Sequence, residues 1–192
     1  MEREHNYTAV SPAGRISLQH VAAAIKKVRA MDMAQRESLA DEIFSKQPNL
    51  LASCLVQPRL GVDMQSVEVL LNILLVCYQA MKESGLDWPV ISEDDQERQM
   101  QRTVGAVKFS EDIPDPTVEE AARAQYLDNH PEQPLLAFVL AESNTWLRDL
   151  ARRQTESESD KFVMMASINL VNCIAYAEPR TKASTCLIDR IL

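Results

Sequence analysis

The chain has 192 residues, of which 46% are apolar and 25% charged, and its net charge is −8. This composition is typical of a folded globular protein, and the length allows one well-buried core or two small cores in contact. A negative net charge disfavours nucleic acids and anionic membranes as partners. Only four glycines are present, while Ala, Leu, Met, Gln, Glu and Arg are frequent. This bias favours helices over a β-sandwich or barrel. We therefore predict an all-α fold, an irregular helical bundle of about 8–9 helices.

The cysteines of the chain indicate the cellular compartment in which the protein is expected. The four cysteines lie among apolar neighbours without any C-x-x-C spacing, at Cys54, Cys77, Cys173 and Cys186. Cysteines in such surroundings usually remain free thiols in a reducing environment and pack as small, buried hydrophobic side chains. The first residues, M-E-R-E-H-N-Y, lack the apolar core of a signal peptide. A cytoplasmic location is therefore expected, with a secreted protein containing a disulfide as the alternative.

Residues 1–14 are polar and contain Pro12 and Gly14 without any apolar period, which predicts a mobile N-terminal arm. Glu2 and His5 have the E-x-x-H spacing found in carboxylate-bridged dimetal bundles. Those sites require two copies of the motif and further inward-facing glutamates. One copy in a predicted arm does not make a metal site.

The N-terminal helical half, residues 15–104, is predicted to begin with helices over 17–30 and 32–46. Ser17 suits the N-cap of the first helix, and Asp32 with Gln35 forms a capping box for the second. The last turns of the first helix carry three cations, Lys26, Lys27 and Arg29. Their simplest interpretation is a solvated face that offsets the helix dipole, and the functional alternative is a basic patch for an acidic partner.

A DNA-binding helix-turn-helix is a further interpretation of these two helices. The connection between them lacks a glycine turn, however, and the second helix carries Glu37, Asp41 and Glu42 where hydrogen-bond donors would be needed. Nucleic-acid binding is therefore disfavoured.

The stretch from Ser66 to Met81 is predicted to be the central buried helix. Twelve of its sixteen residues are apolar, and it is too short and interrupted to span a bilayer, which needs about twenty apolar residues. Its polar residues Glu68, Asn72 and Gln79 share one side of the helix. A short helix from Pro48 to about Gln57, ended by Pro58, is expected before it, with Asp63 as N-cap and Gly85 as C′ residue of the central helix.

Two features that follow are candidates for function. Trp88 lies in an apolar loop over 85–91, where packing on the core is favoured over ligand binding. The acidic run Glu93, Asp94 and Asp95 opens a helix ending near Thr103, capped by Ser92. Consecutive side chains point around a helix and do not converge on one ion, so the helix dipole explains these acids better than a metal site does.

Residues 105–116 contain two prolines and are predicted to be an extended joint between two helical halves. The C-terminal half, 117–192, should begin with a helix capped by Thr117 and Glu120. His130 marks a break, and a long helix should run to about Arg153. Nothing around any serine or cysteine indicates a nucleophile that His130 would activate, so a loop histidine is the simpler interpretation.

A second apolar helix is predicted over 159–177, capped by Thr155 and Glu158, with a polar edge through Asn169, Asn172 and Tyr176. Its polar edge and that of the central helix are either exposed or in contact between the halves. A last short helix is predicted to dock through Leu187, Ile188 and Ile191.

The two halves can be aligned as a degenerate duplication of a three-helix unit, with Cys77 matched to Cys173 and Leu74 to Leu170. The alternative is that two core helices with a similar apolar period look alike. One compact domain made of both halves is expected in either case.

The sequence holds no glycine-rich phosphate loop, no paired Cys/His zinc ligands and no activated nucleophile. No catalytic residue is named, and neither a cofactor nor a metal is predicted. The favoured function is a non-enzymatic helical protein–protein interaction module with an acidic surface, acting as adaptor, regulator or inhibitor. The partner is expected to be another protein or a second copy of the chain. The alternatives are a small all-α hydrolase or lyase with carboxylates converging between helices, and a helical pocket for an apolar ligand.

Overall fold

The computed structural model describes residues 15–111, 115–155 and 157–180. The predictions for the N-terminal arm, for Glu2 with His5, for Cys186 and for the last helix lie outside these residues. Within them the chain forms eight α-helices and one short 3₁₀-helix. These are α1 (Leu18–Ala30), α2 (Met33–Lys46), α3 (Pro48–Leu55), η1 (Gln57–Leu60), α4 (Met64–Glu83), α5 (Glu93–Glu111), α6 (Pro116–Asp128), α7 (Gln133–Arg153) and α8 (Asp160–Tyr176). The all-α prediction is confirmed.

Helix caps explain where several of these helices begin. The Ser17 side chain caps α1, the Asp32–Gln35 capping box opens α2, and Asp63 accepts from two backbone N–H groups at the start of α4. Each satisfies donors that the first helical turn leaves unpaired. Gly85, at φ 69°, takes the left-handed conformation just after α4, which a residue with a side chain adopts at a cost. These predictions from the sequence are confirmed.

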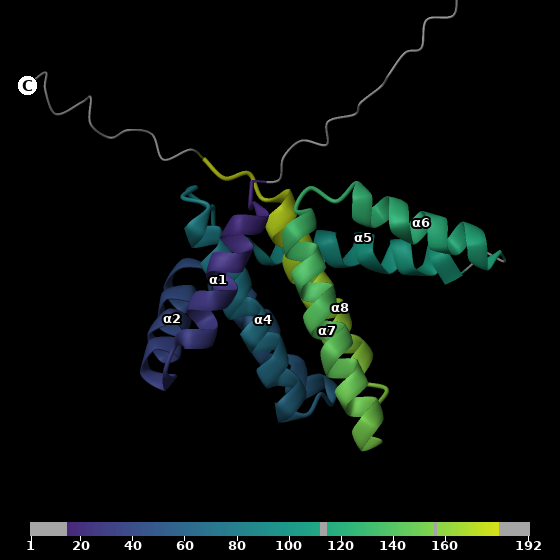
Figure 1. Ribbon diagram of the computed structural model, residues 1–192, viewed down its shortest axis with the longest axis horizontal. Coiled ribbons are helices and arrows are strands. Elements are labelled where there is room, and N and C mark those ends of the chain that lie inside the picture. Colours follow the sequence, from purple (N-terminus) through teal and green to yellow (C-terminus); the bar gives the residue numbers. More distant parts are fainter. Residues whose placement is uncertain (1–14, 112–114, 156, 181–192) are drawn as a thin grey trace, which may run out of the picture.

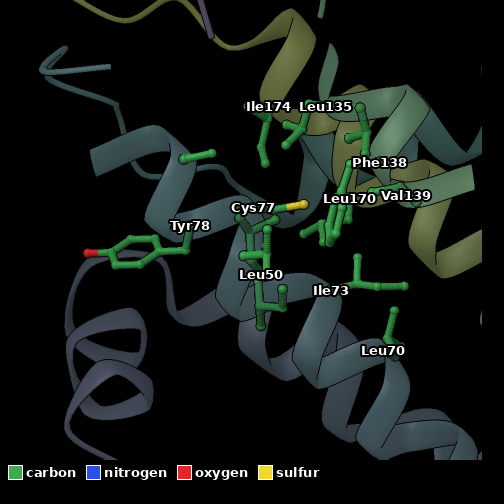
Figure 2. Packing of buried hydrophobic residues seen from close by; sticks show 14 of the residues in the cluster. Leu50, Leu70, Ile73, Cys77, Tyr78, Leu135, Phe138, Val139, Leu170 and Ile174 are labelled. Atoms are coloured by element: carbon green, nitrogen blue, oxygen red, sulfur yellow. The ribbon is translucent and has the colours of Figure 1, made fainter. Parts of the chain in front are cut away.

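The core is organised around α4, which packs against α1, α2, α3, α7 and α8. Its residues Leu70, Ile73, Leu74 and Cys77 are completely buried. Figure 2 shows Leu70, Ile73 and Cys77 beside side chains contributed by α7 and α8, namely Leu135, Phe138, Val139, Leu170 and Ile174. Contact on so many sides explains why the helix is apolar around most of its circumference. The predicted role of the central helix is confirmed.

α4 is also the one helix among the described residues that is long and apolar enough to cross a membrane by length and composition. Most of the relevant window, 61%, is buried inside the fold, as in the core helix of a soluble protein. The polar edge of α4 is partly covered as well. Arg36 of α2 donates to Asn72 at 3.3 Å, and Gln79 is buried with its amide donating to Glu83, while Glu68 is exposed.

Three local predictions are wrong. Residues 105–111 are not extended, because α5 continues through Glu111; the helix accommodates Gly105, and both prolines of the segment follow its last residue. Asp115, and not Thr117, caps α6, with Pro116 at the first helical position, where its missing N–H costs nothing. α8 begins at Asp160, whose carboxylate accepts from the Ser157 N–H, so the proposed Thr155–Glu158 cap does not form. The helix that begins at Pro48 does end before Pro58, at Leu55, and Pro58 lies in the separate 3₁₀-helix η1 that follows.

The proposed duplication stays a prediction. The first helix of each aligned unit is placed differently: α2 packs against α3 and α4, whereas α6 packs against α5 and α7. Figure 1 shows α5 and α6 running side by side, transverse to α4, α7 and α8, and extending away from them. We call α5 from Val104 onward together with α6 the α5–α6 hairpin, and α1 to α4 with α7 and α8 the helical body.

Candidate functional site

A buried polar network joins the base of the hairpin to the helical body, with Asn172 of α8 at its centre. The Asn172 Oδ1 atom accepts from the Tyr126 hydroxyl at 3.1 Å and lies 3.0 Å from His130 Nε2. Its Nδ2 atom donates to Thr103 Oγ1 at 3.0 Å, and the Thr103 hydroxyl donates to the Gln99 carbonyl. One side chain therefore connects α5, α6, the α6–α7 turn and α8.

The partners determine the tautomer of His130. Its Nδ1 atom accepts from the Glu132 backbone N–H at 3.1 Å, so the ring proton lies on Nε2 and is donated to Asn172. Burial lowers the pKa of His130 below its usual value, although the hydrogen bond to Asn172 opposes this shift. A neutral histidine with both nitrogens engaged has no lone pair available for proton transfer to a substrate.

Arg15 and Glu132 extend the same network to the start of α1. Glu132 is completely buried, and its Oε1 lies 2.9 Å from Arg15 Nε while its Oε2 accepts from the Ile16 N–H at 2.9 Å. The Arg15 guanidinium also donates to the carbonyls of Ile174, Ala175 and Ala177 at the end of α8, and lies 5.1 Å from the Trp88 ring. These are the backbone acceptors that a helix C-terminus leaves unpaired. The ion pair therefore closes the end of the bundle.

The network is structural, because nearly all of its polar atoms are satisfied within the protein. The neighbouring Asn169 donates to the Gln96 carbonyl at 3.2 Å, and among the described residues its Oδ1 is the one buried side-chain atom near the network without a partner. Of the two alternatives for the α8 polar edge, the structure shows a contact: Asn169 and Asn172 are buried against α5, and only Tyr176 is exposed.

The other candidates from the sequence have local roles. Trp88 packs on the core and its indole N–H donates to the Met81 carbonyl and the Ser84 hydroxyl, both at 3.1 Å. Asp95 exchanges hydrogen bonds with Ser92 as an N-terminal cap and pairs with Arg98. The Ser92 hydroxyl is the main cause of its lowered pKa.

Two of the three cations near the end of α1 form ion pairs within the fold. Lys27 pairs with Glu83 at 2.7 Å and Arg29 with Glu142 at 3.3 Å, each tying α1 to a neighbouring helix. Lys26 and Arg29 flank a wide, open depression of about 590 Å³ whose floor is formed by Ala22, Ile25 and Ala30. A second hollow of about 280 Å³ lies between the 89–91 loop and the adjoining parts of α5 and α8. Neither encloses a ligand as a small-molecule pocket does.

Little among the described residues supports an acid–base catalytic site, a reactive thiol or a metal site. No group of three or more His, Cys, Asp or Glu side chains is placed to hold a metal ion there. The two buried carboxylates, Glu132 and Asp160, lie at opposite ends of α8, which is about 24 Å long at 1.5 Å per residue. Burial raises the pKa of Cys54 and of Cys173 to about 12 and raises that of Cys77 as well, which disfavours reactive thiolates.

The feature that stands out is the exposed surface of the α5–α6 hairpin. None of the described side chains over 104–108 and 115–129 is buried. Apolar residues nonetheless recur there at helical spacing: Val104 and Val107 on α5, and Val118, Ala122 and Tyr126 on α6. Val118 is 52% exposed and Val107 44%. An apolar stripe of this kind normally faces a core, so this one is left with an open side.

Sequence reasoning missed both the network and the hairpin surface. Arg15 and Glu132 are separated by 117 positions, and no local pattern links them. The hairpin had one signal in the sequence: residues 116–128 contain few apolar residues for a helix that would be covered on more than one side.

Comparisons with family models, with curated proteins and with solved structures each returned no match for this chain.

Proposed function

We propose that this chain is a non-enzymatic helical protein that acts through protein–protein contact, and that the α5–α6 hairpin is its docking surface. The observation that carries the proposal is the half-exposed apolar stripe on a hairpin with no buried side chain among its described residues. Exposed apolar surface on a folded protein costs solubility and is typical of interaction sites. Adaptor, regulator and inhibitor are all compatible with such a surface.

The base of the hairpin supports this proposal. Thr103 and Tyr126 both bond Asn172, so α5 and α6 are each fixed to α8 where they leave the body. A preorganised surface loses less conformational entropy on binding than a disordered segment does. The free, buried cysteines among the described residues support the reducing, cytoplasmic location that we include in the proposal.

Affinity capture tests the proposed surface. A tagged chain, its Val118→Glu variant and its Leu127→Glu variant are each used to capture proteins from lysate of the native cell, followed by mass spectrometry. Leu127 is the matched control, because it is 40% exposed and lies on the opposite side of α6 from Val118. We expect wild type and Leu127→Glu to recover the same protein, and Val118→Glu to lose it because a charge would have to be buried in the contact. Capture that is equal for all three variants, or absent for all, would count against the proposal.

A further inference from the structure

We propose that the partner of the α5–α6 hairpin is a basic amphipathic helix of another protein. The apolar face of that helix covers the apolar stripe of the hairpin, and its lysine or arginine side chains meet the acids beside the stripe. An amphipathic helix that lays its apolar face on a hydrophobic surface is a recurring mode of recognition. This inference rests on the hairpin being a docking surface and adds the chemistry of its partner.

The net charge of the two helices favours a basic partner. α5 carries five acids against three bases, and residues 115–128, which are α6 with its N-cap, carry four acids against one arginine. These net charges of −2 and −3 are most of the net charge of −8 of the whole chain. An acidic surface attracts a partner of opposite sign and repels one of the same sign. Nucleic acids, anionic lipid surfaces and a second copy of the hairpin are therefore disfavoured as partners.

The bases of α5 do not reverse this charge. Arg98 pairs with Asp95 at 3.0 Å, and the Arg102 guanidinium lies 5.1 Å from the Tyr176 ring of α8. Both arginines are therefore engaged where α5 still contacts the helical body. Lys108 is the one base that α5 contributes to the hairpin itself.

One acid of α6 borders the apolar stripe. Glu119 comes three positions before Ala122 and seven before Tyr126, so it shares their side of the helix. Glu120 comes seven positions before Leu127 and lies with it on the opposite side. A partner helix laid along the stripe can therefore place a lysine or arginine beside Glu119 while its apolar residues contact Ala122.

The position of the hairpin leaves room for a further helix. The hairpin extends away from α4, α7 and α8 (Figure 1), and its described side chains over 104–108 and 115–129 are all at least partly exposed. α6 has 13 residues, which makes it about 20 Å long at 1.5 Å per residue. A partner helix of about four turns matches this length.

Fluorescence anisotropy on the purified full chain tests the proposal. The probe is a labelled synthetic peptide of about 18 residues, with leucine on one face of the helix and lysine on the other. Its matched control carries glutamate in place of every lysine. We expect the lysine peptide to bind about tenfold or more tightly than the glutamate peptide, and this advantage should decrease as salt is added.

Variants of α6 locate the contact. Glu119→Lys should weaken binding of the lysine peptide about two- to fivefold, because an attraction beside the stripe becomes a repulsion. Glu120→Lys is the matched control: it changes the net charge equally on the opposite side of the same helix, and it should change the affinity less than about twofold. Val118→Gln should weaken binding about three- to tenfold, because it removes apolar area without adding charge. Circular dichroism checks that helix content is unchanged.

A lysine peptide that binds no more tightly than the glutamate peptide would overturn the basic partner. Equal losses for Glu119→Lys and Glu120→Lys, or binding that is insensitive to Val118→Gln, would overturn it as well. None of these results decides the proposed function. If one protein is still captured from lysate in a Val118-dependent way, the hairpin remains a docking surface for a partner of different chemistry; if that capture fails too, both proposals fail.

Discussion

At the scale of single residues, Asn172 is the polar side chain at the centre of the buried network. It accepts from Tyr126 and His130 and donates to Thr103, and it is itself 4% exposed. A buried network whose hydrogen bonds are all made contributes modestly to the free energy of unfolding. Removing one member costs more, because its former partners stay buried without a hydrogen bond.

Replacing Asn172 with alanine should therefore destabilise the protein by about 2–4 kcal/mol, since the buried His130 Nε2–H loses its acceptor. Urea unfolding followed by circular dichroism measures the change. Asn144→Ala, at an exposed position on α7, is the matched control and should stay within about 0.5 kcal/mol of wild type. Equal stability of the two variants would show that the network contributes nothing.

His130 should make stability depend on pH. Burial lowers its pKa in the folded protein from the ordinary value of 6.5. Above that value the ring is neutral in both states and contributes no slope. As the pH falls below it, the unfolded chain binds a proton that the folded protein resists, so the free energy of unfolding decreases by at most about 1.4 kcal/mol per pH unit. The loss is complete once the pH is below the folded pKa.

The groups facing His130 set the size of this effect. Asn172 and Tyr126 are neutral, and Glu132, which favours the protonated ring, is already paired with Arg15. Urea unfolding at a series of pH values from 8 to about 5, on wild type and His130→Gln, measures the slope. The variant should lack this component, and identical slopes in both proteins would assign the pH dependence to other groups.

At the scale of elements, α4 and the α5–α6 hairpin differ most in how much of their surface is buried. α4 contacts five other α-helices and the 3₁₀-helix η1 and is buried on most sides, whereas α6 has no buried residue among those described. Helical stability in proteins comes mainly from packing of an apolar face. The hairpin should therefore be the least stable part of the fold without a partner, while α4 should unfold only with the whole molecule.

Leu74 tests the position of α4 in the core. It is completely buried, so Leu74→Asp would bury an unpaired charge at a cost of several kcal/mol against a total stability of about 5–15 kcal/mol. We expect the variant to lose cooperative thermal unfolding. Met64→Asp is the control, because Met64 is 64% exposed in the first turn of the same helix, where a carboxylate suits the helix dipole. A cooperatively melting Leu74→Asp protein would mean that α4 is peripheral.

At the scale of the whole molecule, the helical body has a single core and the hairpin extends from it (Figure 1). The polar contacts of Arg15, Glu132 and Asn172 are concentrated where the two parts meet. Attachment of an otherwise open surface through a hydrogen-bonded base suits the docking role that we propose for the hairpin. It also explains why the candidate site contains few of the residues that the sequence singled out for chemistry.

The sequence by itself determined the all-α class, the central helix and several helix ends. These depend on local physics: an apolar period of 3.6 residues, side chains that cap backbone donors, and glycine after a C-terminus. Asp32, Asp63 and Gly85 were recognisable because their partners are a few positions away.

Only the tertiary structure decided which residues and helices that are distant in the sequence lie side by side. The pairing of Arg15 with Glu132 joins residues 117 positions apart, and the contacts of Asn172 join four segments of the chain. It also decided that α5 continues through the predicted joint and that none of the described side chains of α6 is buried. The physical reason is that an apolar stripe specifies the need for burial but not the partner, which depends on how all the helices pack together.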